Sequence, residues 1–123
     1  MERGGVERRR GRRIMIEAPL LVRRVSEGEP EPFVEQMTKN ISLAGICFET
    51  SEGRYAVNDL LTASVSIPEP QRRNFPFTRL AGRTRVVRVD PLPQQDAGVP
   101  RRCGVALEFG DDLIALTATP LRG

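Results

Sequence analysis

The chain of 123 residues contains no histidine and no tryptophan, and Lys39 is its only lysine. The absence of histidine removes the commonest general base and metal ligand, and it excludes hydrolases that depend on a Ser-His or Cys-His pair. Only Cys47 and Cys103 carry thiols, and they form no Cys-x-x-Cys pair that could begin a zinc site. We therefore expect no catalytic residues, metal or cofactor, and the composition favours a binding protein over an enzyme.

Long apolar stretches are also missing. No hydrophobic run approaches the roughly 18 residues that a membrane-spanning helix needs. The amino terminus is charged but has no apolar segment after it, so no secretory signal is expected. We therefore predict a cytoplasmic protein without a membrane span. In that reducing compartment both cysteines are expected to be free thiols that pack as small hydrophobic residues.

Charge is distributed unevenly along the chain. Residues 1–24 hold eight arginines against three glutamates, and residues 71–123 hold nine arginines against five acidic residues. The segment between them is acidic, with two basic and eight acidic groups. Two basic regions in one small chain suggest an anionic partner, although a solvated charged surface explains the same pattern.

Apolar and polar residues alternate over much of the chain, which predicts strands. In residues 60–67, Leu61, Ala63, Val65 and Ile67 fall on one face. Residues 102–109 alternate in the same way. Residues 78–89 form a longer strand, which we expect to be mostly solvated because its arginines, at positions 79, 83, 85 and 88, are divided between its two faces. Residues 14–25, 33–41 and 46–50 complete the expected strands. Residues 90–101, which contain three prolines and a glycine, are expected to form a loop.

Only residues 111–118 have a pattern compatible with a helix, with Asp111 or Asp112 as its cap and Leu113, Ala115 and Leu116 facing inward.

About six short strands separated by turns predict an all-β fold, either a small antiparallel barrel or a sandwich. We expect one domain at residues 8–118, a flexible tail at 1–7 and a C-terminal tail at 119–123.

Two short motifs carry the chemical information. The first is the run Glu-Arg-Arg-Arg-Gly-Arg-Arg at residues 7–13, which contains Arg-x-x-x-Arg as Arg9 and Arg13, or as Arg8 and Arg12. The second is Asn-Ile-Ser-Leu-Ala-Gly at residues 40–45, which has the form Asn-x-Ser-x-x-Gly and lies in a predicted turn. Separately, the first could be a disordered basic arm and the second an ordinary turn or a glycosylation sequon.

Together and in this order, the two motifs resemble those of the PilZ domain, a bacterial receptor module for the second messenger cyclic di-GMP. The following strand, the proline-rich hairpin loop and residues 103–109 also fall where that family has similar elements. The resemblance implies a six-stranded antiparallel β-barrel, to which we add the short C-terminal helix. It also implies a ligand site at Arg9 and Arg13 with Arg8 in support, and at Asn40, Ser42 and Gly45.

The expected function is a cyclic di-GMP receptor that changes its N-terminal arm on binding and presents an altered surface to an effector protein. Gly45 is expected to provide a positive φ or a close backbone approach at the turn. The alternative is a barrel of the same kind that binds no nucleotide and acts as a protein-interaction scaffold. Single-stranded nucleic acid is disfavoured as a partner, because such barrels use aromatic platforms and this chain has one tyrosine and five phenylalanines.

Overall fold

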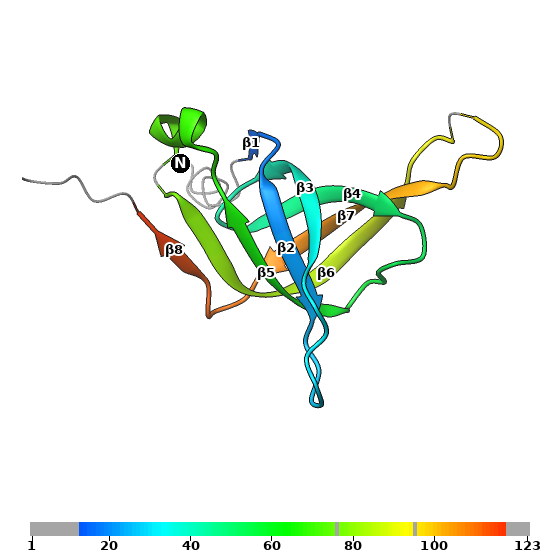
Figure 1. The fold of residues 1–123 in the computed structure, drawn as a ribbon, viewed down its shortest axis with the longest axis horizontal. Coiled ribbons are helices and arrows are strands. Elements are labelled where there is room, and N and C mark those ends of the chain that lie inside the picture. The colour runs from blue at the N-terminus through cyan, green and yellow to red at the C-terminus, as the bar shows by residue number, and fades with distance from the viewer. Residues whose placement is uncertain (1–12, 76, 95, 118–123) are drawn as a thin grey trace, which may run out of the picture.

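The computed structural model describes residues 13–75, 77–94 and 96–117. These ranges form strands and one 3-10 helix (Figure 1), in the order β1 (Ile14–Met15), β2 (Pro19–Arg24), β3 (Val34–Ile41), β4 (Gly45–Ser51), β5 (Leu60–Ser66), η1 (Glu69–Asn74), β6 (Arg79–Pro91), β7 (Arg102–Phe109) and β8 (Ile114–Leu116). None of the helical structure in the described ranges reaches the length and apolarity of a membrane-crossing helix.

The strands form one antiparallel sheet that closes on itself. Its order is β1-β3-β2-β5-β6-β7-β4, and a further pairing of β3 with β4 joins the two ends. β2 to β7 form the six-stranded barrel, β1 extends its wall beside β3, and β8 adds to β6. The predicted six-stranded antiparallel barrel is confirmed.

The interior of the barrel is filled by the apolar faces that alternation predicts. Leu61, Ala63, Val65 and Ile67 are all fully buried. Phe48 packs edge-to-face against Tyr55 with ring centroids 5.8 Å apart. Full burial of an aliphatic or aromatic side chain contributes about 1.5–3 kcal/mol, so these inward residues supply most of the stability. Both cysteines are free, Cys103 buried as expected and Cys47 only partly buried.

The predicted helix at the C-terminus is wrong in the described part of the segment. Residues 114–116 form β8, which pairs with Arg79–Ala81 of β6. A helix of about two turns is marginal by itself. The early part of β6 instead offers backbone groups on one edge that β8 satisfies, and the N–H of Thr78 also donates to the carbonyl of Leu116 at 2.7 Å. Leu113 packs against the core, whereas Ile114 and Leu116 are exposed.

The first predicted strand, residues 14–25, is interrupted between β1 and β2. The buried hydroxyl of Thr38 on β3 accepts a hydrogen bond from the N–H of Ala18 at 2.9 Å and donates to the carbonyl of Ile16 at 2.7 Å. These side-chain bonds stand beside two backbone bonds, from the N–H of Ile16 to the carbonyl of Lys39 at 3.2 Å and from the N–H of Thr38 to the carbonyl of Ala18 at 3.0 Å. β6 also continues to Pro91, so the proline-rich loop is shorter than residues 90–101.

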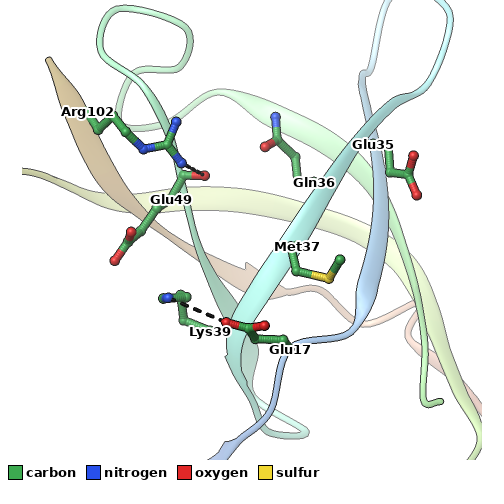
Figure 2. Close-up of a pocket in the computed structure, with 7 residues that line it drawn as sticks. All are labelled: Glu17, Glu35, Gln36, Met37, Lys39, Glu49 and Arg102. Atoms are coloured by element: carbon green, nitrogen blue, oxygen red, sulfur yellow. Dashed lines mark hydrogen bonds and ion pairs between the residues drawn. The ribbon is translucent and has the colours of Figure 1, made fainter. Parts of the chain in front are cut away.

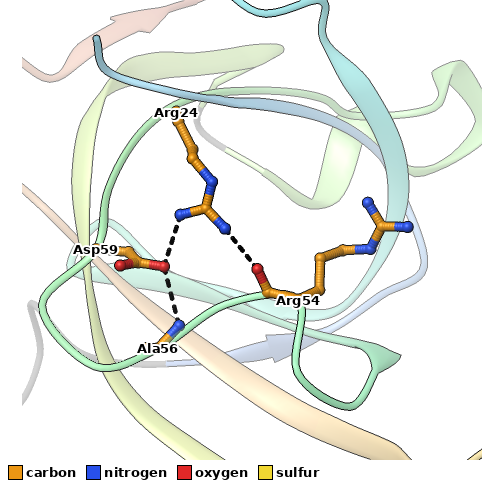
Figure 3. A network of polar contacts seen from close by, with 4 residues as sticks. All are labelled: Arg24, Arg54, Ala56 and Asp59. Carbon is orange, nitrogen blue, oxygen red and sulfur yellow. Dashed lines mark hydrogen bonds and ion pairs between the residues drawn. The ribbon is translucent and has the colours of Figure 1, made fainter.

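A polar network fastens the loop between β4 and β5 to the barrel (Figure 3). Arg24 donates to the Asp59 carboxylate at 2.8 Å and to the carbonyl of Arg54 at 2.5 Å. The same carboxylate accepts the N–H of Ala56 at 2.9 Å. These hydrogen bonds hold the pKa of Asp59 below its usual range, with the Arg24 bond the largest cause. The network therefore holds the loop most firmly when Asp59 is ionised.

Candidate functional site

Strand pairing brings the two motifs to one place. β1 pairs with β3 so that Ile14 faces Ile41 and Met15 faces Asn40. Arg13, directly before β1, is therefore beside the end of β3. Its Nη1 donates to Asn40 Oδ1 at 2.7 Å and to Cys47 Sγ at 3.1 Å. One guanidinium nitrogen thus contacts a pair of facing residues on β3 and β4, since Asn40 and Cys47 are partners in that ladder.

Asn40 is partly buried, and its side-chain oxygen is engaged by Arg13. An amide has one acceptor oxygen and two N–H donors. The bond from Arg13 takes one lone pair of that oxygen, so the group can still accept one hydrogen bond and donate two. Its two N–H donors suit acceptors such as a carbonyl, a ring nitrogen or a phosphate oxygen.

Ser42 belongs to the framework of the turn between β3 and β4. Its Oγ accepts hydrogen bonds from the N–H groups of Ala44 at 3.0 Å and Gly45 at 3.2 Å, and its own N–H donates to the Gly45 carbonyl at 2.9 Å. The residue is 5% exposed. The ordinary-turn interpretation therefore accounts for a serine at this position, and only the hydroxyl hydrogen remains for another acceptor.

Gly45 is needed because the backbone of β7 lies against it. A Cβ at this position would lie 2.0 Å from the Leu107 carbonyl oxygen, closer than real side chains come. Among the described glycines, only Gly53 and Gly98 have positive φ. Of the two reasons expected for Gly45, the close backbone approach is the one that applies.

The other predicted site residues, Arg8 and Arg9, lie outside the described residues. The structure therefore brings together Arg13, Asn40, Ser42 and Gly45 and leaves the rest of the arginine motif untested. Sequence reasoning missed Cys47 as a neighbour of the site. Its facing position opposite Asn40 follows from strand register, which alternation along one strand does not give.

Two hollows lie close to this group on the outer face of the barrel. The smaller, of about 180 Å³, is lined by Lys39, Asn40, Cys47, Phe48, Glu49, Arg88, Asp90, Gly104 and Val105. The larger, of about 380 Å³ (Figure 2), is lined by Glu17, Glu35, Gln36, Met37, Lys39, Glu49 and Arg102. Its three carboxylates and two cations make it acidic, so an anionic ligand is disfavoured there.

No other chemistry stands out around the turn. The described residues hold no group of three or more histidine, cysteine or acidic side chains that could bind a metal ion. Burial raises the pKa of the Cys103 thiol, and the charge of Glu52 raises it further. That shift keeps the Cys103 thiol protonated, which fits a packing role.

A family model described as the PilZ domain matches residues 7–118, which include both motifs and the eight strands of the described residues. No curated protein shows significant similarity to the chain.

Proposed function

The chain belongs to the PilZ domain family, and we propose on that premise that it is a receptor for cyclic di-GMP. The family consists of binding and adaptor domains, not enzymes. The observation that carries the proposal is the contact between Arg13 and Asn40, which joins residues 27 positions apart in the sequence. One residue from each motif thereby lies at the end of β3, which supports a common site.

The chemistry of these residues fits the ligand. Cyclic di-GMP has two phosphates and two guanines, and the arginine fork binds both phosphate oxygens and the O6/N7 edge of guanine in a bidentate manner. We assign this role to Arg13 and to Arg9, with Arg8 in support. The amide N–H groups of Asn40 would donate to an acceptor of guanine, and the Ser42 hydroxyl hydrogen to a phosphate oxygen.

Binding is proposed to signal through the N-terminal arm. Arg13 already contacts Asn40, and a ligand bound by Arg8 and Arg9 as well would hold the whole arm, residues 8–13, against the β3–β4 turn. This would alter the surface that an effector protein contacts. Limited proteolysis tests this step. We expect slower cleavage within residues 8–13 in the presence of cyclic di-GMP, and equal cleavage rates with and without the ligand would contradict the mechanism.

Calorimetric titration of the full chain with cyclic di-GMP tests the receptor function, with GTP as the control ligand. Micromolar binding corresponds to about −8 kcal/mol, and a hydrogen bond to a charged group contributes about 1.5–3 kcal/mol. Arg13→Ala should therefore weaken binding roughly 10- to 100-fold. Arg101→Ala, an exposed arginine on the β6–β7 loop, is the matched control and should bind as the unaltered chain does.

The results also separate the alternatives. Unchanged affinity in Arg9→Ala would assign the first motif to Arg8 and Arg12 instead. No binding at high micromolar ligand, measured at two temperatures to exclude a near-zero enthalpy, would identify a scaffold that binds no nucleotide. Oligonucleotide binding with a steep salt dependence would instead indicate a nucleic-acid partner.

A further inference from the structure

Strands β3 and β4 separate over part of their length. β6 carries a one-residue bulge at Val87 and stays paired with β7 on both sides of it, whereas the pairing of β3 with β4 ends at Thr38 and Phe48. Both strands continue beyond that pair, β3 back to Val34 and β4 on to Ser51. The hollow of about 380 Å³ lies in the gap between them (Figure 2).

The gap is bridged toward the core and open toward the outside. The Gln36 amide on β3 donates to the Thr50 hydroxyl on β4 at 3.3 Å, and Thr50 is only 5% exposed. Met37, the next residue of β3, is 49% exposed and lines the hollow. A side-chain bond therefore joins the strands on the inside, and the outer face of the gap is free for another molecule.

The cations of this hollow are already engaged, whereas two of its carboxylates are not. Arg102 Nη2 donates to the carbonyl of Glu49 at 3.2 Å, and Lys39 Nζ lies 3.8 Å from the Glu17 carboxylate. Within the described ranges, the carboxylates of Glu35 and the half-buried Glu49 lie within 4.0 Å of no cation. The hollow therefore has acidic groups to offer to a positively charged partner.

A second hollow, of about 460 Å³, continues the first onto the loop between β6 and β7. The two hollows share Glu49 and Arg102, and we call them together the outer groove. The loop end of the outer groove is apolar, with Leu92, Pro93, Val99 and Pro100 among its lining residues. The Gln94 amide donates to the carbonyl of Val99 at 3.0 Å, and the N–H of Leu92 to the carbonyl of Arg102 at 3.0 Å. These bonds hold the apolar end in shape.

We propose that the outer groove binds an extended segment of an effector protein in which a lysine or arginine stands near an apolar residue. The inference rests on the adaptor role in the proposed function and names the chemistry of the partner. The basic side chain would pair with Glu35 and Glu49, and the apolar one would pack against the loop. Because the whole chain has a net charge of +3, this acidic groove differs from the overall charge and would direct a basic segment to one place.

Other occupants fit the outer groove less well. Its carboxylates would repel nucleic acid and anionic lipid. A wholly apolar partner would bury the carboxylates of Glu35 and Glu49 without a cation, which is costly. A second copy of this chain has arginines of its own, and the experiment below distinguishes that occupant from an effector.

Selection of decapeptides from a random phage-displayed library on the immobilised full chain, with and without cyclic di-GMP, tests the proposal. We expect enrichment of peptides that combine lysine or arginine with leucine, isoleucine, valine or phenylalanine. The double variant Glu35→Lys/Glu49→Lys should reverse the charge preference and enrich acidic peptides. Circular dichroism establishes that each variant is folded.

A synthetic copy of one enriched peptide is then titrated by fluorescence anisotropy. Glu49→Gln and Val99→Ser should each weaken its binding about 3- to 10-fold, since each removes one partly exposed contact. The matched controls are Glu69→Gln on η1 and Val57→Ser on the β4–β5 loop, which alter exposed side chains outside the outer groove. Both should bind the peptide as the unaltered chain does.

Three results would overturn the proposal. The first is the absence of enriched basic–apolar peptides, and the second is unchanged peptide affinity in Glu49→Gln and Val99→Ser. The third is a dimer in analytical ultracentrifugation that Glu49→Gln dissociates, because the occupant would then be a second copy.

Failure of this proposal is distinguishable from failure of the receptor function. A chain that binds cyclic di-GMP but selects no basic–apolar peptide keeps the receptor function and refutes the outer groove as a docking site. A chain that selects such peptides but binds no cyclic di-GMP supports the groove and is the scaffold alternative.

Discussion

The close contact at Gly45 leads to a quantitative prediction about the fold. In Gly45→Ala, the new methyl group would lie 2.0 Å from the carbonyl oxygen of Leu107 and 3.1 Å from its carbonyl carbon. That carbonyl belongs to a ladder in which Gly45 faces Glu108 and Ile46 faces Leu107. Neither backbone can move without breaking this pairing, so the clash cannot be relieved by a side-chain rotation.

The expected cost exceeds that of ordinary overpacking in a core, which is about 1–3 kcal/mol. We expect Gly45→Ala to lose at least about 3 kcal/mol, a value among the larger effects of single substitutions. Urea unfolding followed by circular dichroism measures it. With a slope of about 1–3 kcal/mol per molar urea, the midpoint should fall by at least about 1 M.

Gly104→Ala is the matched control, because Gly104 is also a strand glycine but its added Cβ meets only ordinary contact distances. Its unfolding midpoint should change little. A Gly45→Ala midpoint close to that of Gly104→Ala would refute the argument that the β4–β7 approach requires glycine.

Further predictions concern single polar groups. Because the folded-state pKa of Asp59 is lowered, mainly by Arg24, its contribution to stability is complete above the unfolded value of about 3.9 and is lost as the pH falls through the folded value. Asp59→Asn should therefore show a flatter dependence of unfolding free energy on pH below about 4, and an unaltered slope would contradict this. Asn58 has φ of 80°, so Asn58→Ala should be about 1 kcal/mol less stable in urea than Asn58→Gly. Ser42→Ala leaves two amide hydrogens without their acceptor and should cost about 1–3 kcal/mol by the same assay. Thr38→Val removes the hydroxyl that bridges β1 and β2 and should have a cost of similar size; a neutral effect would mean that water replaces it.

Periodicity predicted the barrel strands well wherever one face is buried. The alternation of residues 60–67 and 102–109 corresponds closely to β5 and β7, because burial on one side imposes a period of two. It failed where tertiary contacts override it. Between β1 and β2 the chain is bonded to the hydroxyl of Thr38, about 20 residues away, and β8 pairs with the free early edge of β6. Neither partner is visible in the local sequence.

The candidate site was predictable as a set of residue types but not as an arrangement. The order of the two motifs predicted that Arg13 and Asn40 share one site, and in the structure Arg13 Nη1 lies 2.7 Å from Asn40 Oδ1. The bulge at Val87 was not predictable, because it adds one residue to a strand that otherwise alternates regularly. Strict alternation therefore divides Arg79, Arg83, Arg85 and Arg88 between the two faces of the strand, whereas all four are exposed in the structure.

The geometry also divides the second motif into two kinds of residue. Ser42 and Gly45 have structural reasons for their identity, since one holds the turn and the other admits β7. A scaffold that binds no nucleotide would need both of them equally. Arg13 and Asn40 are different, because a contact between two polar side chains at the surface adds little to stability. Substitutions at these two positions are therefore expected to change stability little, whatever they do to ligand binding. Substitutions of Arg13 and Asn40 can therefore distinguish a receptor from a scaffold, because they should change ligand affinity without changing the free energy of unfolding. Substitutions of Ser42 and Gly45 cannot, because they should change the free energy of unfolding in either case.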